Sequence, residues 1–212
     1  MRRWLLIGNS RWHWAAPAPD QSLQLWHTSA ADGADQLQQA PAAWAAVGSV
    51  PKELERWQPQ RLLTSDVPLA QLPPALGVDR ALAAWGAWQH QRQPVLVADA
   101  GTALSLTLVD AAGCFQGGRL MAGGRLQLQA LHQGTADLPT LRHLETADPM
   151  WATRTTEAMA SGVDGPNRIC CLQMLQRGEI GGALVQSLQL QASTSHQPPP
   201  LKTARGIHQR QA

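Results

Sequence analysis

The stretch VLVADAGTALSLTLVDAAGCFQGGRLMAGG, from Val95 to Gly124, decides the fold that we expect for this chain. Its apolar run Val95–Val97 is typical of a buried strand, which would end at Asp99. Leucines at positions 104, 106 and 108 recur with the period of two that a returning strand requires. Gly101 permits a sharp turn between the strands because it has no Cβ. The stretch therefore predicts a β-hairpin, followed by a further turn and a third short strand.

The tip of this hairpin combines a carboxylate, a glycine and a hydroxyl, from Asp99, Gly101 and Thr102. Backbone N–H groups and oxygen ligands at such a turn can cradle a phosphate and a cation. The same residue types are common in turns that bind nothing. Taken alone, the stretch leaves a ligand-binding turn and an ordinary hairpin turn about equally open.

A similar arrangement occurs about ninety residues earlier in the chain. Trp4–Ile7 and Trp12–Ala16 are predicted strands, and Gly8-Asn9-Ser10 lies between them. An internal repeat predicts architecture. We therefore expect two similar lobes whose turns face each other across a cleft.

Helix and strand patterns outside the two hairpins complete an α/β prediction. Strands are expected at Leu23–His27, Ala45–Val50 and Arg61–Thr64. Helices are expected at Asp32–Ala46, Lys52–Trp57, Ala81–Gln91, Leu126–His132, Thr155–Gly162 and Asn167–Gln176. From Gln191 onward, consecutive prolines and the loss of apolar periodicity predict a disordered tail.

Composition excludes several classes of protein. The 212 residues, enough for one large or two small domains, carry 17 basic and 15 acidic side chains, a net charge of +2. This charge predicts neither a nucleic-acid partner nor an anionic membrane surface. The three cysteines lack metal-ligand spacing and suit a reducing compartment. The apolar run Trp4–Ile7 is too short for a signal peptide, and no run reaches membrane-spanning length, so we expect a cytoplasmic protein.

The segment from Gly77 to Arg80 precedes the predicted helix Ala81–Gln91. Asp79 is placed where a carboxylate can cap a helix or interact with its dipole. The guanidinium of Arg80 can bind a carboxylate or phosphate, although an isolated arginine is more often a surface residue. For both residues a structural and a functional interpretation stay open.

Six motifs, in order, resemble those of the type III pantothenate kinases, a family of the acetate and sugar kinase, Hsp70 and actin superfamily. They are Gly8-Asn9-Ser10, Gly77-x-Asp79-Arg80, Asp99-Ala100-Gly101-Thr102-Ala103, Gly117-Gly118 with Gly123, Thr135-Ala136-x-Leu138-Pro139, and Thr155 to Gly162. The resemblance implies duplicated ribonuclease-H-like (actin-like ATPase) lobes. The first lobe would span residues 1–92, the second 93–190, and the tail 191–212.

The resemblance also implies roles for residues of several motifs. Asp79 is similar to the general base that accepts the proton of the pantothenate primary hydroxyl. The implied pantothenate-binding residues are Gly77, Val78, Asp79, Arg80 and Thr155. The implied ATP-binding residues are Leu6, Ile7, Gly8, Asn9, Ser10, Arg11, Trp12, His13 and Thr102. Asp99 is similar to the ligand of an activating monovalent cation, K⁺ or NH₄⁺, and ATP would carry Mg²⁺. The family implies a homodimer.

The chain departs from the family pattern at four places. Leu6 occupies the position of an aspartate that helps to hold the metal, Ala122 replaces a proline, and Arg154 replaces an asparagine. After Gly162 the chain offers at most Gly181-Gly182 in place of the usual Thr-Gly-Gly segment. We therefore expect an incomplete second lobe.

The function implied by the resemblance is ATP-dependent phosphorylation of pantothenate to 4′-phosphopantothenate, the first step of coenzyme A biosynthesis. The departures leave open a catalytically impaired homologue that acts as an accessory or regulatory protein. A third possibility, an aspartyl-phosphate hydrolase with Asp99 as nucleophile, is disfavoured. That chemistry usually requires a second carboxylate two residues later, where this chain has Gly101.

Overall fold

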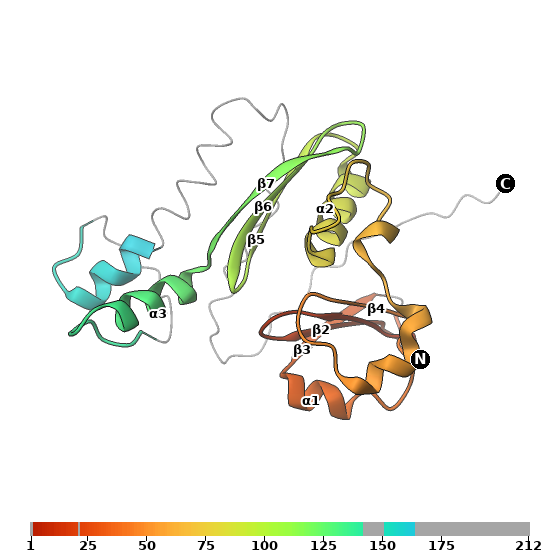
Figure 1. The fold of residues 1–212 in the computed structure, drawn as a ribbon, viewed down its shortest axis with the longest axis horizontal. Helices are drawn as coiled ribbons and strands as arrows, with labels where there is room; N and C mark the ends of the chain where they lie inside the picture. The colour runs from red at the N-terminus through yellow and green to blue at the C-terminus, as the bar shows by residue number, and fades with distance from the viewer. Residues whose placement is uncertain (1, 21, 142–150, 164–212) are drawn as a thin grey trace.

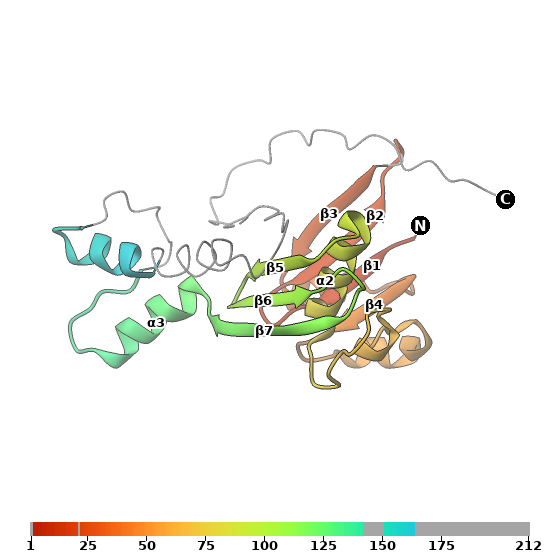
Figure 2. The same ribbon diagram turned by 90° about the horizontal axis from the view of Figure 1, so that it is seen from above.

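The computed structural model describes residues 2–20, 22–141 and 151–163, which form two β-sheets and several helices (Figures 1 and 2). The strand order is β3-β2-β1-β4 in the first sheet and β5-β6-β7 in the second. This mixed α/β architecture confirms the expected fold class at that level. The predicted boundaries between lobes, and the predicted incompleteness of the second lobe, stay predictions.

The first sheet consists of β1 (Trp4–Ile7), β2 (Trp12–Pro17), β3 (Leu23–Thr28) and β4 (Ala43–Ala46). Strand β1 pairs antiparallel with β2 and parallel with β4, and β3 adds antiparallel to β2. The first hydrophobic core lies against one face of this sheet. It contains Leu5, Ile7, Trp12, Trp14, Leu37, Trp44 and Leu54. Helix α1 (Ala30–Asp35) and the 3₁₀ helix η1 (Lys52–Gln60) lie on the side of the sheet away from β5 (Figure 1).

Alternation along the strands places a different set of residues on the opposite face of the first sheet. Leu6 pairs in register with His13, and His13 pairs with His27. Residues directly opposite one another in antiparallel strands share a face. Leu6, His13 and His27 therefore form a row across β1, β2 and β3 on the face that is not the core.

The second sheet consists of β5 (Val95–Ala100), β6 (Ala103–Val109) and β7 (Phe115–Ala122), all antiparallel. Helix α2 (Val78–Gln91) packs on one face of it, and the short helix η2 (Thr64–Asp66) precedes α2. The core between them includes Leu76, Ala81, Ala84, Val95 and Val109. The hairpin predicted from Val95 onward is confirmed, and this packing holds the start of α2 against the sheet.

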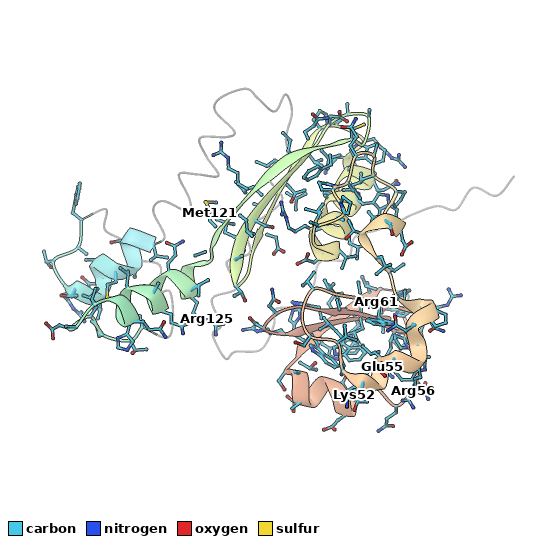
Figure 3. The ribbon with its side chains drawn as sticks, in the orientation of Figure 1. Lys52, Glu55, Arg56, Arg61, Met121 and Arg125 are labelled. Carbon is cyan, nitrogen blue, oxygen red and sulfur yellow. The ribbon has the colours of Figure 1, made fainter. Side chains whose placement is uncertain are left out.

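A helical arm continues from β7. It contains α3 (Gly124–Gly134) and a helix over residues 155–163, and its small core includes Leu128, Met159 and Val163. Figures 1 and 2 both show the arm at the end of the molecule far from the first sheet. Met121 and Arg125 mark the junction between β7 and α3, whereas Lys52, Glu55 and Arg56 lie on η1 at the other end of the molecule (Figure 3).

Two sequence predictions are wrong. The helix expected over Asp32–Ala46 is limited to α1, and Ala43–Ala46 forms strand β4. Trp44 is 1% exposed and pairs with Leu5, so burial in the sheet outweighs the local helical pattern, and Pro41 cannot donate a helical hydrogen bond.

The strand expected over Arg61–Thr64 is reduced to a single bridge between Arg61 and Trp44, and residues 64–66 form η2. The expected helix Asn167–Gln176, the Gly181-Gly182 fragment and the tail from Gln191 lie outside the described residues. Over the ranges that the structure describes, none of the helices has the length and apolar character needed to cross a bilayer.

Candidate active site

The two predicted phosphate-binding turns meet in the folded chain. A hydrogen bond of 2.5 Å joins the hydroxyls of Ser10, in the β1–β2 turn, and Thr102, in the β5–β6 turn, although 92 residues separate them. Figure 1 shows the end of the β5–β6 hairpin above the first sheet. The juxtaposition that the repeated hairpins predicted is therefore present in the structure.

The β1–β2 turn is built by close backbone contacts. The N–H of Gly8 donates to the carbonyl of Arg11 at 3.0 Å. A Cβ added to Gly8 would lie 2.9 Å from that carbonyl oxygen, and a Cβ on Gly48 would lie 2.6 Å from the oxygen of Gly8. Both distances are shorter than a side chain tolerates, so glycine at positions 8 and 48 is what lets these backbone segments approach each other.

The β5–β6 turn depends on a glycine from the end of β7 in the same way. The N–H of Gly123 donates to the carbonyl of Thr102 at 2.9 Å, and the N–H of Gly101 donates to the carbonyl of Ala103. A Cβ on Gly123 would collide with the carbonyl oxygens of Gly101 and Thr102. The glycine motif after β7 therefore supports the turn that carries Thr102.

Asp79 lies in the first turn of α2, but it is not the N-cap residue. Gly77 occupies the N-cap position, and no side chain caps the helix there. A carboxylate oxygen of Asp79 accepts a hydrogen bond from the N–H of Arg80 at 2.7 Å, and a Cβ on Gly77 would lie 2.5 Å from the same oxygen. The spacing Gly-x-Asp thus gives the half-buried carboxylate room to fold back along the helix start.

Arg80 is anchored to the second sheet. Its Nε donates to the hydroxyl of Thr107 at 3.2 Å and its Nη2 to the carbonyl of Leu106 at 3.1 Å. Gly118 on β7 leaves the space for this guanidinium, because a Cβ there would collide with Nη2. The alternative of an unattached surface arginine is therefore wrong. Thr107 and Leu106 carry no signal in the sequence as partners of Arg80, because only the packing of α2 against β6 brings them together.

The electrostatics of the site link residues from both sheets and from α2. Partial burial raises the pKa of the Asp99 carboxyl above its ordinary value, and the negative charge of Asp79 raises it further. Partial burial also lowers the pKa of His13, with a smaller lowering from His27, while Asp99 and Asp79 act in the opposite direction. Each of these pKa directions therefore includes a contribution from a residue on another element of the site.

The other predicted site residues differ in their exposure to solvent. Asn9 and Ser10 are solvent-exposed, His13 is partly exposed, Leu6, Gly8 and Arg11 are half-buried, and Ile7 and Trp12 belong to the buried core. Val78 is buried at the start of α2.

Thr155 does not lie with these residues. It is exposed at the start of the helix over residues 155–163, which lies beside α3 in the arm (Figures 1 and 2). An ion pair of 3.2 Å joins Arg154, just before this helix, to Glu157 in its first turn. Within one chain, therefore, the arm does not bring Thr155 to the two turns.

The available ligands at the turns are oxygens. The carboxylate of Asp99 and the hydroxyls of Ser10 and Thr102 suit hard cations such as Mg²⁺ or K⁺. No group of three or more histidine, cysteine, aspartate or glutamate residues able to hold a metal occurs within residues 2–20, 22–141 and 151–163. This donor set fits a divalent ion that enters with a phosphate ligand better than one held by protein side chains alone.

Comparison with known proteins gives one consistent family. A family profile described as type III pantothenate kinase matches residues 64–164. The chain is 43% identical to a type III pantothenate kinase of Synechococcus elongatus over 176 residues, which cover 75% of this chain and 71% of the relative. It is 43% identical to that of Thermosynechococcus vestitus over 164 residues, with coverage of 75% and 64%. It is 39% identical to that of Gloeobacter violaceus over 169 residues, with coverage of 74% and 70%.

Proposed function

Because the chain belongs to the type III pantothenate kinase family, we propose that it transfers the γ-phosphoryl group of ATP to the primary hydroxyl of pantothenate. The product would be 4′-phosphopantothenate, and the reaction would begin coenzyme A biosynthesis. The chain spans 64–71% of the length of the relatives from T. vestitus and S. elongatus.

The observation that carries the proposal is the hydrogen bond between Ser10 and Thr102, which joins two turns from different sheets beside Asp99. Phosphoryl transfer depends mainly on positioning and on neutralising the charge of the phosphates. Two glycine-supported turns with backbone N–H groups and hydroxyls can supply both. The implied ATP-binding stretch from Leu6 to His13, together with Thr102, would perform this task.

Asp79 is the proposed general base. Its carboxylate is half-buried at the N-terminus of α2, and it is close enough to Asp99 to influence that residue's pKa. A base must lie within hydrogen-bond reach of the proton that it removes. Pantothenate would therefore lie with its primary hydroxyl at Asp79, beside the helix start formed by Gly77 and Val78. Arg80 would stabilise this segment through its bonds to Thr107 and Leu106.

Mg²⁺ bound to ATP would neutralise phosphate charge, and a monovalent cation, K⁺ or NH₄⁺, would be held at Asp99. The raised pKa of Asp99 supports this role, since a nearby cation would relieve the repulsion between Asp99 and Asp79. Leu6 supplies no carboxylate on β1, which makes Asp99 the principal acidic ligand in the proposed arrangement.

We further propose duplicated lobes and a homodimer. The two hairpins whose turns meet at Ser10 and Thr102 support the duplication. Apolar side chains that are exposed along β7 and the arm support a subunit interface there. They are Leu120, Leu126, Leu131 and Trp151. Thr155 belongs to this arm, so its proposed contact with pantothenate would depend on assembly or movement of the arm. The cytoplasmic location and the lack of a nucleic-acid partner stay predictions from composition.

The test is to identify the product of the purified protein by mass spectrometry after incubation with pantothenate, ATP and Mg²⁺. The proposal predicts formation of 4′-phosphopantothenate and ADP in equal amounts. ATP hydrolysis that does not depend on pantothenate would instead support the hydrolase. Stable folding and ATP binding without either reaction would support the impaired homologue.

A further inference from the structure

A pair of histidines lies on the face of the first sheet that is not the core. His13 on β2 and His27 on β3 are register partners. Their rings make an edge-to-face contact, with centroids 4.7 Å apart and planes at 79°. Aromatic rings prefer this arrangement, and it restricts the rotation of each ring. The pair is therefore a defined contact and not two side chains that point independently into solvent.

His13 connects this pair to the β1–β2 turn. Its Nε2 lies 3.3 Å from the position that a Cβ on Gly8 would occupy, so the imidazole stands against the start of the turn. Ser10 of the same turn bonds to Thr102. The imidazole also interacts electrostatically with Asp99 and Asp79. His13 thus lies where the two turns and the start of α2 come together.

His27 has a different position. It belongs to β3, which lies at one end of the first sheet, and no motif of the family resemblance includes it. Its side chain is exposed, and the contact that relates it to the site is the one with the ring of His13. Without that contact the exposed imidazole of His13 could populate other staggered side-chain conformations.

We propose that His27 is a positioning residue, which holds the imidazole of His13 against the β1–β2 turn so that His13 donates a hydrogen bond to the phosphates of bound ATP. The inference rests on the proposed function only in taking ATP as the ligand. The lowered pKa of His13 agrees with it, since partial burial and the neighbouring His27 favour the neutral imidazole, which keeps one N–H to donate.

The test is a double-mutant cycle on the full chain, read as the dissociation constant of MgATP measured by titration calorimetry. His13→Ala should weaken binding about tenfold, because it removes a hydrogen bond to a charged group. His27→Ala should weaken it about threefold, because it removes the restraint and leaves the donor. The double variant should bind no more weakly than His13→Ala alone, since His27 acts through His13.

Two further variants separate positioning from a general structural effect. His27→Phe keeps an aromatic ring at the edge of His13 and should bind MgATP nearly as wild type does. His27→Gln keeps a polar side chain at this exposed position without an aromatic ring, so its dissociation constant for MgATP should equal that of His27→Ala. This variant takes the place of His27→Ala in the cycle if the alanine variant does not fold. Leu25→Ala is the matched control, because Leu25 lies two residues earlier on β3, on the same face, and is 62% exposed. It should leave the dissociation constant unchanged.

The proposal is overturned if His13→Ala or His27→Ala binds MgATP as tightly as the wild type does. It is overturned if His27→Phe loses as much affinity as His27→Ala. It is also overturned if His27→Ala weakens binding by its full factor when it is added to His13→Ala. It is also overturned if the wild-type chain does not bind MgATP. Wild-type chain that binds MgATP but does not phosphorylate pantothenate would contradict the proposed function, and the histidine cycle would still decide the role of His27.

Discussion

At the scale of single residues, Asp99 is the acidic side chain whose environment is most informative. Its carboxyl lies in the β5–β6 hairpin near both Asp79 and His13, and partial burial together with Asp79 raises its pKa. A charged carboxylate in that position is therefore disfavoured unless a cation compensates for it.

If Asp99 holds the monovalent cation, the rate of pantothenate phosphorylation should rise when K⁺ or NH₄⁺ replaces Na⁺ at constant ionic strength. Asp99→Ala should lose this response, because the carboxylate ligand is gone. Initial rates in the three chloride salts, with thermal melts of both proteins, provide the measurement. Equal wild-type rates in all three salts would remove the cation from the account.

Asp99 should also destabilise the folded protein at neutral pH. Because its pKa is raised above the ordinary value of 3.8, the folded state binds this proton more readily than the unfolded chain does. Stability is therefore lost as pH rises from the ordinary pKa to the raised one. Asp99→Asn should increase the free energy of unfolding at pH 7 by about 0.5 kcal/mol or less, since solvent screens a partly exposed group.

This increase should vanish below the ordinary pKa, where both proteins carry a neutral side chain at position 99. Urea unfolding without added K⁺, at pH 7 and at a pH below 3.8, measures the difference. A gain that persists unchanged at the lower pH would show that the charge of Asp99 is not its cause.

At the scale of elements, the contact between α2 and the second sheet positions Asp79. Arg80, the next residue, bonds across to Leu106 and Thr107 on β6, and Gly118 on β7 makes room for its guanidinium. These contacts hold the first turn of α2 at a defined position along the strands. The geometry of the proposed base thus depends on a glycine about forty residues away in sequence.

Gly118→Ala should therefore destabilise the fold and weaken catalysis together. The added Cβ would collide with Arg80 Nη2 and with the Leu106 carbonyl oxygen, which predicts a loss of about 1–3 kcal/mol in the free energy of unfolding. Gly86→Ala on α2 is the matched control, because a Cβ there meets nothing within 4 Å. It should stabilise the protein by about 0.5–1 kcal/mol, since glycine is unfavourable inside a helix.

Chemical denaturation of both variants, with kcat measured in parallel, tests this pair. Equal stability of the two variants would mean that the guanidinium is not confined as the structure shows it.

Elements with a local sequence signal could be predicted, whereas contacts that depend on pairing between distant segments could not. The hairpins around Ser10 and Thr102 have local signals, namely alternating apolar residues and a glycine turn, so both were predicted. The sequence predicts a strand over Ala45–Val50, but β4 spans Ala43–Ala46, because pairing with β1 and burial bring Trp44 into the strand. The anchoring of Arg80 and the pairing of His13 with His27 likewise depend on register, which a single sequence does not show.

At the scale of the whole molecule, the two sheets meet at the proposed nucleotide site. Ser10 and Thr102 already form one bond across this meeting point. A ligand that contacts both turns should therefore stabilise the folded chain as a whole. Ligand at one hundred times its dissociation constant should add about 2.7 kcal/mol to the free energy of unfolding.

Thr102→Ala should show a smaller increase in melting temperature on addition of a fixed concentration of MgATP, because its hydroxyl is part of the proposed site. Thr135→Ala offers a control, since Thr135 bonds to Leu131 in the helical arm and should leave the increase unchanged. Thermal melts with and without MgATP measure both. Identical shifts in the wild type and in Thr102→Ala would place the nucleotide elsewhere.

The central claim is that the start of α2 and the two joined turns form one active site for phosphorylation of pantothenate. The most direct measurement compares kcat of the wild type and of Asp79→Asn at saturating pantothenate and ATP. Asparagine preserves the size of the side chain but cannot accept the proton, so kcat should fall about 10²–10⁴-fold while the melting temperature changes little. Turnover of Asp79→Asn close to that of the wild type would contradict the account and leave Asp79 as a structural residue of the first turn of α2.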